Sequence, residues 1–391
     1  MKTPKKMAPR IPLAWANLVQ SVPRMAVSLG GVAFAVMLMF VEMGFLNGLY
    51  DSQTNVVEKF NADLVMVHAH KQAVAPTLAF PHQRLIQARG HAGVAATYAL
   101  YAEELRAGWK NARDNTIYPI LVFGFHPDEP VFLIPEVKAQ AALLRIPGTA
   151  LIDSKSKPFY GDLSAGVEGE LSGHRVKLVG TFPLGPDFRA DGTLLVSERT
   201  FLRSFADPAT GRTNSGRIDF GLIKLVEGAD PGTVQAALIR DLPDDVSVLT
   251  PAELSSRLRD YWGNSKPVGY VFGLGMFIGF VIGVMICYQI LYTDVQDHLP
   301  QFATLKAMGY SNEFLRRTVL EQALYLALLG FFPGLAASWI VYRALEWYSG
   351  IPMILAPERI VLVFAFAIVM CVAAGMIAIR KVIELDPAEV F

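Results

Sequence analysis

Cysteine is scarce in this chain of 391 residues, and net charge is absent. There are two cysteines, Cys287 and Cys371, and 35 Lys and Arg balance 35 Asp and Glu. Both cysteines lie inside apolar runs, so the pattern excludes a disulfide framework. A chain without a positive surplus gives no electrostatic reason to expect a nucleic-acid partner.

Catalytic signatures are missing as well. The sequence contains no HExxH, no G-x-S-x-G, no C-x-x-C and no GxxxxGK[ST]. His68 and His70, two residues apart on an expected strand, could start a metal site, but no third ligand lies nearby. A partly exposed strand face is the favoured interpretation of the pair. We therefore expect no enzymatic activity, no metal and no cofactor bound by this chain itself.

Charge is also nearly absent from four long runs. The chain is 52% apolar, with a mean hydropathy of +0.35, and about 20 apolar residues are enough to cross a bilayer as a helix. The runs predict four transmembrane helices, at residues 25–48, 268–292, 318–342 and 360–380. The first is too long for a typical signal peptide and is expected to stay as an uncleaved anchor.

Positive charge outside these runs predicts the orientation. Lys and Arg gather in residues 1–24, in the segment 294–317 and at the start of the tail 381–391. Because basic loops stay in the cytoplasm, both termini and the second loop should be cytoplasmic. Residues 51–266 and the short loop 343–359 should then lie outside, in the periplasm. Residues 1–24 also contain apolar side chains at helical spacing, which predicts an amphipathic segment or a simple basic leader.

Glu42 is the one charge within the first run. A carboxylate at the centre of a bilayer costs about 2.5–3.5 kcal/mol, and such groups often mark a pathway or a partner. Glu42 lies about four residues from the outer end of its run, so contact with water or with a cleft between subunits is the favoured interpretation.

Residues 51–266 are long enough to bury a core of their own. Segments rich in β-branched and apolar residues predict strands at 63–69, 116–123, 176–182, 193–197, 218–226 and 246–249. Helices are expected at 83–88, 197–205, 231–242 and 251–262, with Ser197 and Thr250 as caps. This mixed order predicts an α+β domain. The fold class is therefore a membrane protein with four transmembrane α-helices, in a 1+3 layout, and a large extracytoplasmic α+β domain between helices 1 and 2.

The polar segment 294–317 carries the signals of a compact helix. Pro300 suits a first helical turn, and Phe302, Leu305 and Met308 recur at helical spacing. Gly309 can end that helix in a left-handed conformation, and Ser311 can cap the next. A shaped helix in a loop this short indicates a surface for a partner. An ordinary amphipathic loop is the alternative.

Three glycines, Gly275, Gly279 and Gly283, recur every four residues in the second run. They therefore share one helix face, where small residues let helix backbones approach closely in lipid. The stripe predicts a packing seam, either within the subunit or between two copies.

Four stretches resemble the MacB/FtsX-type ABC transporter permeases. Gln301–Tyr310 (QFATLKAMGY) is similar to the family's cytoplasmic coupling segment, and Asp386-Pro387-Ala388 to its terminal D/E-P-A. Ala62–Val67 is similar to the first strand of its outer domain. Ile11–Ser52 resembles more narrowly the DevC branch, the membrane subunit of DevBCA-type exporters. One departure is the pair Gln301-Phe302, where many members have Arg-Glu.

The resemblance implies a function as well as a fold. The chain would be the permease subunit of an exporter in the bacterial inner membrane, paired with a second permease copy, most simply as a homodimer. Two copies of a separate ATPase would bind ATP and Mg and would push the coupling segment. The outer domain would engage a periplasmic adaptor (a membrane fusion protein) and an outer-membrane channel. The ATPase-coupling residues implied are Gln301, Phe302, Leu305, Lys306, Met308, Gly309 and Tyr310.

Two other functions remain open at the level of sequence. Some relatives in this family extract lipoproteins or regulate cell-wall hydrolases and do not export. A membrane-anchored enzyme is a third class, and the missing catalytic motifs disfavour it.

Overall fold

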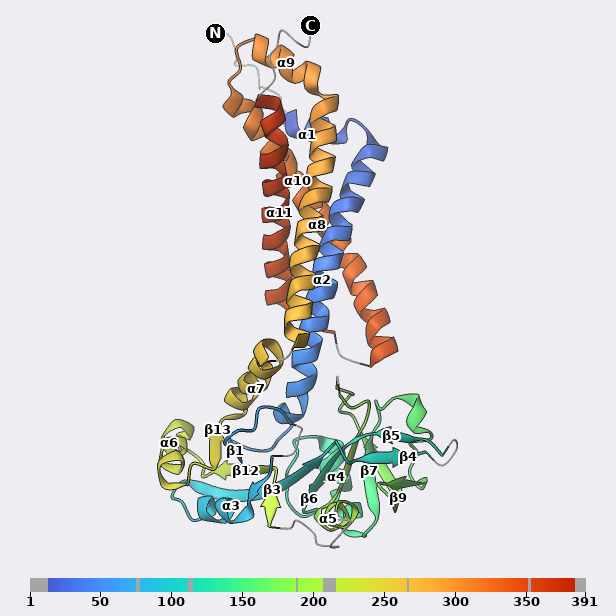
Figure 1. Cartoon of the computed structure of the whole chain (residues 1–391), viewed down its shortest axis with the longest axis vertical. Coiled ribbons are helices and arrows are strands. Elements are labelled where there is room, and N and C mark those ends of the chain that lie inside the picture. Colours follow the sequence, from blue (N-terminus) through green and yellow to red (C-terminus); the bar gives the residue numbers. More distant parts are fainter. Residues whose placement is uncertain are drawn as a thin grey trace, which may run out of the picture. The chain divides into compact units, whose positions relative to one another are not determined.

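A computed structural model describes residues 13–74, 78–111, 115–187, 189–206, 216–265, 267–350 and 353–383 (Figure 1). The chain divides into two compact units. The helical unit comprises Met1–Leu46, Tyr270–Leu345 and Met353–Phe391, and the sheet unit comprises Asn47–Gly269 and Glu346–Pro352. Each unit is described by itself below.

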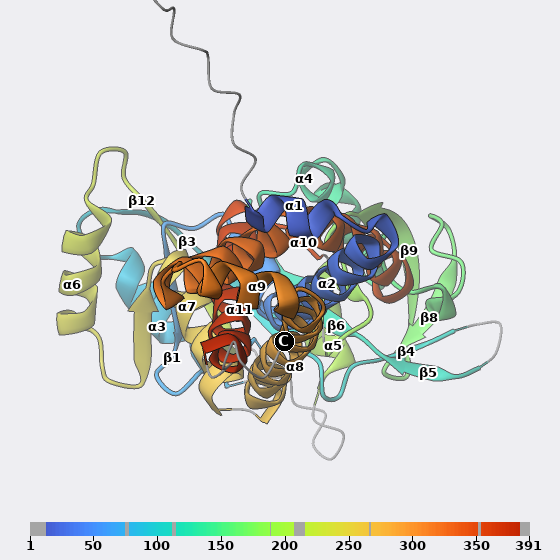
Figure 2. The same ribbon diagram turned by 90° about the horizontal axis from the view of Figure 1, so that it is seen from above.

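Among the residues that the structure describes, the helical unit contains four long helices and two short ones. The long helices are α2 (Val22–Glu58), α8 (Pro267–Asp297), α10 (Asn312–Ser349) and α11 (Pro357–Ile383), and the short ones are α1 (Leu13–Val19) and α9 (Leu299–Ala307). All four long helices are long and apolar enough to cross a membrane, as predicted from their composition. Both α1 and α9 lie across the same end of the bundle (Figures 1 and 2).

Close backbone approach holds the long helices together. Gly330 and Gly334 of α10 lie against α2, where an added Cβ would come 2.6 Å from Val32 Cγ1 and 2.8 Å from Val36 Cβ. On the other side of the bundle, Cys287 of α8 and Cys371 of α11 are fully buried, with their Sγ atoms 3.6 Å apart. Small side chains at these crossings allow tight packing in the absence of any hydrophobic difference between helix and lipid.

The sheet unit is a mixed α/β domain that falls between the first and second long helices in the sequence. Its main sheet has eleven strands in the order β13-β1-β12-β3-β6-β10-β7-β9-β8-β4-β5. The strands are β1 (Leu64–His68), β3 (Val94–Glu103), β4 (Gly108–Lys110), β5 (Ile117–Pro119), β6 (Leu121–Phe125), β7 (Thr149–Asp153), β8 (Glu168–Leu171), β9 (His174–Phe182), β10 (Thr193–Ser197), β12 (Phe220–Leu225) and β13 (Val246–Leu249). A separate pair joins β2 (Phe80–Pro81) to β11 (Arg217–Ile218). Strands β6 and β10, and β7 and β9, run parallel, and the other pairs are antiparallel.

Both faces of this sheet are covered. Along β1, Leu64 and Met66 face one apolar cluster, whereas Val65 and Val67 face the other. One face packs on α3 (His82–Arg89), α5 (Glu198–Ser204) and α6 (Pro231–Asp241), and the other on α4 (Pro135–Gln140), α7 (Pro251–Asp260) and the end of α2. Two short 3₁₀ helices (Ala141–Arg145 and Pro158–Tyr160) and one π-helical turn (Tyr261–Ser265) complete the unit. A strand buried on both faces has no polar alternation, which explains the apolar run Leu64–Val67 in β1.

The predicted α+β domain is therefore confirmed as a mixed sheet with helices. Two segments predicted as single strands are each divided in the structure. The segment 116–123 forms parts of β5 and β6 with Ile120 between them, and the segment 218–226 is interrupted at Asp219. Both capping predictions are confirmed. Ser197 Oγ accepts a hydrogen bond from Thr200 N, and Thr250 forms a capping box with Glu253.

Candidate functional site

The helix α9 has the ends that its sequence predicts. Pro300 lies in its first turn, and Gly309 follows its last turn with a φ of 91°. Gly309 N donates to Lys306 O (3.0 Å), and Tyr310 N donates to Leu305 O (3.1 Å), so the helix closes through a left-handed residue. Glycine suits this position because a Cβ at positive φ is strained.

The next helix, α10, also begins as predicted. Ser311 Oγ accepts a hydrogen bond from Phe314 N (3.3 Å), and Glu313 lies in the first turn. A hydroxyl cap and an early carboxylate both favour the positive end of a helix. The turn between α9 and α10 is thus fixed from both sides by local chemistry.

Phe302 packs α9 against the long helices of the same chain. Its side chain is 2% exposed and packs in a small cluster with Val295, Leu315, Val319 and Ile379. Leu305 packs against the same cluster. Side chains from α8, α10 and α11 cover its ring, so Phe302 does not project into solvent in this structure, and its coupling role stays a prediction.

Three side chains that follow this buried part of α9 are exposed to solvent. We call Met308, Tyr310 and Phe314 the α9 tip. Their exposed fractions are 62%, 46% and 38%, and the rings of Tyr310 and Phe314 lie 4.8 Å apart. Single exposed apolar residues are common, but a contiguous group at the end of a fixed turn is typical of an interaction surface. Of the other predicted coupling residues, Gln301 is exposed, and Leu305 and Lys306 are half-buried.

A polar cluster lies under α9, and sequence analysis missed it. His298 is 4% exposed; its Nε2 lies 2.8 Å from Gln20 Oε1, and its Nδ1 lies 2.8 Å from the carbonyl oxygen of Asp294. The Asp294 carboxylate accepts a hydrogen bond from Gln322 Nε2 (2.8 Å). These hydrogen bonds connect the residue after α1, the junction between α8 and α9, and α10. We call these four residues the His298 cluster.

An ion pair extends this cluster at the bundle end. Arg24 Nη1 lies 2.6 Å from Asp297 Oδ2, beside a cavity of about 340 Å³. Together these contacts tie the start of α2 to the segment that leads into α9. No sequence signal could have paired Gln20 with His298, because 278 residues separate them.

The three glycines of α8 lie against α2 of the same chain. A Cβ on Gly275 would lie 2.5 Å from Glu42 Oε2, and one on Gly279 would lie 3.4 Å from Leu38 Cδ2. A Cβ on Gly283 would lie 3.1 Å from Ala35 Cβ. The three glycines therefore face α2 within the chain, where Glu42 is half-buried, and a seam between two copies stays a prediction.

The histidine pair does not form a metal site in the structure. His68 ends β1, but His70 lies in the following turn, so the two are not on one strand face as expected. His70 N donates to His68 Nδ1 (3.2 Å). Burial lowers the pKa of His68, and the neighbouring His70 adds to this effect. Among the described residues, no group of three or more His, Cys, Asp or Glu could hold a metal ion.

Two stretches of the predicted resemblance fall partly or wholly outside the described residues. Asp386-Pro387-Ala388 lies in the part of the tail that the structure does not describe, as does Ile11 at the other end.

Comparison with protein families gives one match, and it contains the candidate site. Residues 273–387 match the FtsX-like permease C-terminal family. This segment spans most of α8, then α9, α10 and α11. A search of curated proteins found no match.

Several solved structures resemble about half of this chain at low sequence identity. The periplasmic region of MacB from Actinobacillus actinomycetemcomitans has 8% identity and a TM-score of 0.36, covering 52% of this chain and 94% of that one. The extracellular domain of the noncanonic ABC-type transporter YknZ from Gram-positive bacteria has 13% identity and a TM-score of 0.31, covering 48% and 99%. A domain of a putative permease protein from Porphyromonas gingivalis has 16% identity and a TM-score of 0.30, covering 49% and 89%.

Proposed function

We propose that this chain is the permease subunit of an ABC transporter of the MacB/FtsX type, in which a separate ATPase drives motion of the helical unit. The match of residues 273–387 to the FtsX-like permease C-terminal family carries the proposal. Among the described residues of that segment, α9 is the one short helix, and the exposed apolar tip follows its last turn. The tip is the surface to which we assign the ATPase.

The α9 tip is exposed, whereas Phe302 at the other end of α9 is buried, and this difference suits a coupling element. Met308 and Tyr310 are exposed, whereas Phe302 is buried against α8, α10 and α11. A force applied to the tip therefore reaches three long helices through a close-packed cluster, since packed interiors transmit displacement and do not absorb it. The His298 cluster adds a polar connection to the end of α1 and the start of α2.

The wider assembly follows from the resemblance and belongs to the same proposal. Two ATPase copies would hold ATP and Mg, and a second copy of this chain would complete the permease pair. The sheet unit would lie in the periplasm and engage an adaptor and an outer-membrane channel, as in DevBCA-type exporters. The protein would lie in the bacterial inner membrane with both termini in the cytoplasm. Transmission of ATP-driven motion to the sheet unit, and not passage of substrate through this chain, would then drive export.

Substitution at the α9 tip tests the proposal. Met308→Asp places a charge on an exposed apolar side chain without touching the buried base, so the chain should insert and fold normally. Loss of a central apolar contact typically weakens an interface by about tenfold or more. We expect the partner ATPase to be lost from affinity purifications of Met308→Asp, and export to fall with it.

Ile146→Asp is the matched control. Ile146 is 61% exposed, close to the 62% of Met308, but it lies in the sheet unit. This variant should retain the ATPase in full. Undiminished recovery of the ATPase with Met308→Asp would show that the α9 tip is not part of the interface. The assigned coupling role would then be wrong.

A further inference from the structure

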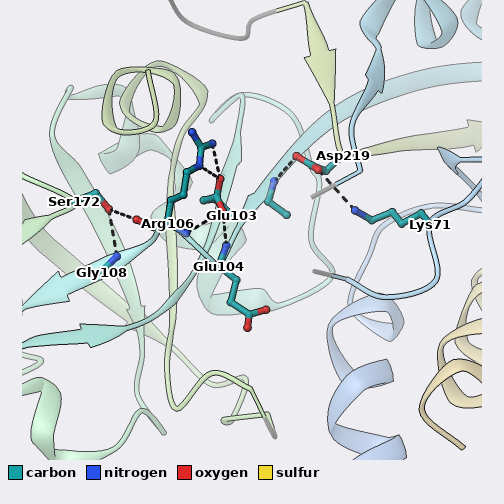
Figure 3. Close-up of polar contacts among 8 residues, drawn as sticks. Lys71, Glu103, Glu104, Arg106, Gly108, Ser172 and Asp219 are labelled. Atoms are coloured by element: carbon teal, nitrogen blue, oxygen red, sulfur yellow. Dashed lines mark hydrogen bonds and ion pairs between the residues drawn. The ribbon is translucent and has the colours of Figure 1, made fainter. Parts of the chain in front are cut away.

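Two buried carboxylates of the sheet unit, Glu103 and Asp219, each face a cation of the same chain. Glu103 Oε2 accepts hydrogen bonds from Arg106 Nε (2.8 Å) and Nη2 (2.5 Å), and Lys71 Nζ lies 3.7 Å from Asp219 Oδ1 (Figure 3). These charges are compensated within the fold, as buried charges in proteins usually are. The helical unit holds a buried pair of another kind, made of the two cysteine thiols.

Cys287 of α8 and Cys371 of α11 are in direct contact. Their Sγ atoms lie 3.6 Å apart, and either thiol can donate to the other. Both side chains are 0% exposed, and both are free thiols in the structure. Sulfur atoms in a disulfide lie about 2.0 Å apart, so each would have to move by only about 0.8 Å. Small side-chain rotations therefore bring the two thiols within bonding distance.

The backbones of α8 and α11 approach closely on both sides of this contact. Gly283 lies one turn before the α8 cysteine and faces the side chain of Met370. Gly375 lies one turn after the α11 cysteine, and an added Cβ there would lie 3.7 Å from Leu291 Cδ1. The two helices are thus in register before and after the thiols, and glycines at these levels permit close approach. Packing on both sides holds the two thiols together.

The surroundings of the thiols admit only small, uncharged reagents. Cys287 lies ten residues before Asp297, the end of α8, which is about 15 Å along the helix. Apolar side chains of the bundle surround both sulfur atoms. Hydrogen peroxide is small and uncharged and can enter such a site, whereas a charged thiol reagent such as glutathione cannot. Because an apolar interior disfavours the reactive thiolate, we expect oxidation over minutes to hours.

We propose that Cys287 and Cys371 are a redox site, at which hydrogen peroxide joins α8 to α11 through a reversible disulfide. One thiol attacks a peroxide oxygen, the O–O bond breaks, and a sulfenic acid and one water form. The second thiol attacks the sulfenic sulfur, the S–S bond forms, the S–O bond breaks, and a second water leaves. The two thiols thereby give up two electrons and two protons. A small dithiol reverses the reaction by exchange and is itself oxidised to a disulfide.

The disulfide constrains the helical unit. The two cysteines are 84 positions apart, so the bond closes a loop that contains α9 and α10. Closing a long loop restricts the unfolded chain and thereby stabilises the folded one. The bond also fixes α8 against α11, while the α9 tip stays exposed. Formation of the disulfide is independent of the proposed coupling, and only an effect on transmitted motion would rest on it.

Thiol counting on the full-length protein in lipid nanodiscs tests the bond. The reduced protein is exposed to millimolar hydrogen peroxide, unfolded in SDS and treated with a polyethylene-glycol maleimide. Because the chain has two cysteines, reduced protein should carry two additions and oxidised protein none. Dithiothreitol, added before unfolding, should restore both, and peptide mass spectrometry should find the two cysteine peptides of one chain joined. Two additions after oxidation, a link between two chains, or a loss that dithiothreitol does not reverse overturns the proposal.

Cys371→Ser/Val369→Cys is the matched control. It keeps two thiols in the same two helices, but Val369 is 54% exposed and, two residues from Cys371, lies on the opposite side of α11. Under the same treatment it should yield no joined cysteine peptides. The joined product in this variant would show that the contact in the structure does not determine the bond, and would overturn the assignment.

Melting temperature measures the constraint. Peroxide should raise the melting temperature of the parent protein by several degrees, whereas Cys287→Ser, which has one thiol, should melt alike with and without peroxide. An unchanged melting temperature despite a formed bond would overturn the stabilising role assigned to the disulfide. Both experiments use this chain without the ATPase, so a failure of the coupling proposal leaves their results unaffected.

Discussion

At the scale of single residues, the chain is predictable where chemistry acts within a few positions. The caps Ser197 and Thr250 and the left-handed Gly309 bond to backbone groups at most five residues away. Such contacts depend on local sequence alone. The burial of Phe302 could not be predicted, because Val319 and Ile379, which cover it, come from other helices. Lys71 and Asp219 lie 148 positions apart in the numbering, and no spacing rule pairs them.

The capping box at Thr250 gives a prediction at this scale. Thr250 Oγ1 accepts a hydrogen bond from Glu253 N (3.2 Å), and Glu253 Oε2 accepts one from Thr250 N (2.7 Å). Thr250→Ala should destabilise the start of α7 by about 1 kcal/mol. Backbone amides of α7 should then exchange with deuterium about fivefold faster, by mass spectrometry. Ser256→Ala, at an exposed position in the same helix, should not accelerate exchange.

The same box predicts a pH dependence. The backbone hydrogen bond from Thr250, and then the side chain of Gln235, hold the pKa of Glu253 below its ordinary value of 4.5. A carboxyl whose pKa is lower in the folded state stabilises fully above its unfolded pKa, and this contribution is lost as pH falls through the folded value. Between neutral pH and pH values below about 4.5, the melting temperature of Glu253→Gln should therefore fall less than that of the parent chain. Parallel pH profiles of the two proteins would contradict this account.

At the scale of elements, hydrophobic runs were sufficient to predict the long helices, and β-branched segments were sufficient to predict β1, β10 and β13. The strands β2, β3, β4, β7 and β8 were missed. The sequence of β3, VAATYALYAE, is rich in alanine, which has low strand propensity, and β3 forms because β12 and β6 pair with it on both sides. Strand pairing of this kind is a long-range property, and a local pattern does not contain it.

The glycine seam of α8 yields the prediction for this scale. A Cβ on Gly283 would lie 2.2 Å from Met370 Sδ and 3.1 Å from Ala35 Cβ, whereas one on Gly273 meets nothing within 4 Å. Gly283→Leu should therefore destabilise the helical unit by about 1–3 kcal/mol through overpacking. Gly273→Leu, in the same helix, should be close to neutral. Melting temperatures of the two variants in nanodiscs measure the difference, and equal melting would show that α8 does not pack on α2 and α11 as described.

At the scale of the whole molecule, the sequence predicted four apolar helices and a mixed domain between the first two. It did not predict the order of eleven strands or the burial of both sheet faces. The family match covers residues 273–387, so the remaining assignments, including membrane orientation, rest on charge distribution and on resemblance.

Orientation is the prediction at this scale. We expect a cysteine at Ala307, which is exposed in α9, to lie in the cytoplasm, and one at Ile146 to lie in the periplasm. A membrane-impermeant maleimide should label Ile146→Cys in intact spheroplasts, and Ala307→Cys only after permeabilisation. The native Cys287 and Cys371 are 0% exposed and provide a low background. Labelling of Ala307→Cys in intact spheroplasts would show that the topology is the reverse of the predicted one.

The eleven-stranded sheet has short strands at both of its edges. Its two end strands are short: β13 has four residues, and β5 has three, the last of which is Pro119. Proline lacks an amide hydrogen, and a strand of three or four residues is a poor template for the backbone of a neighbouring molecule. Copies of this domain at high concentration should therefore pair poorly through their sheet edges. We expect concentrated protein to form no fibrils.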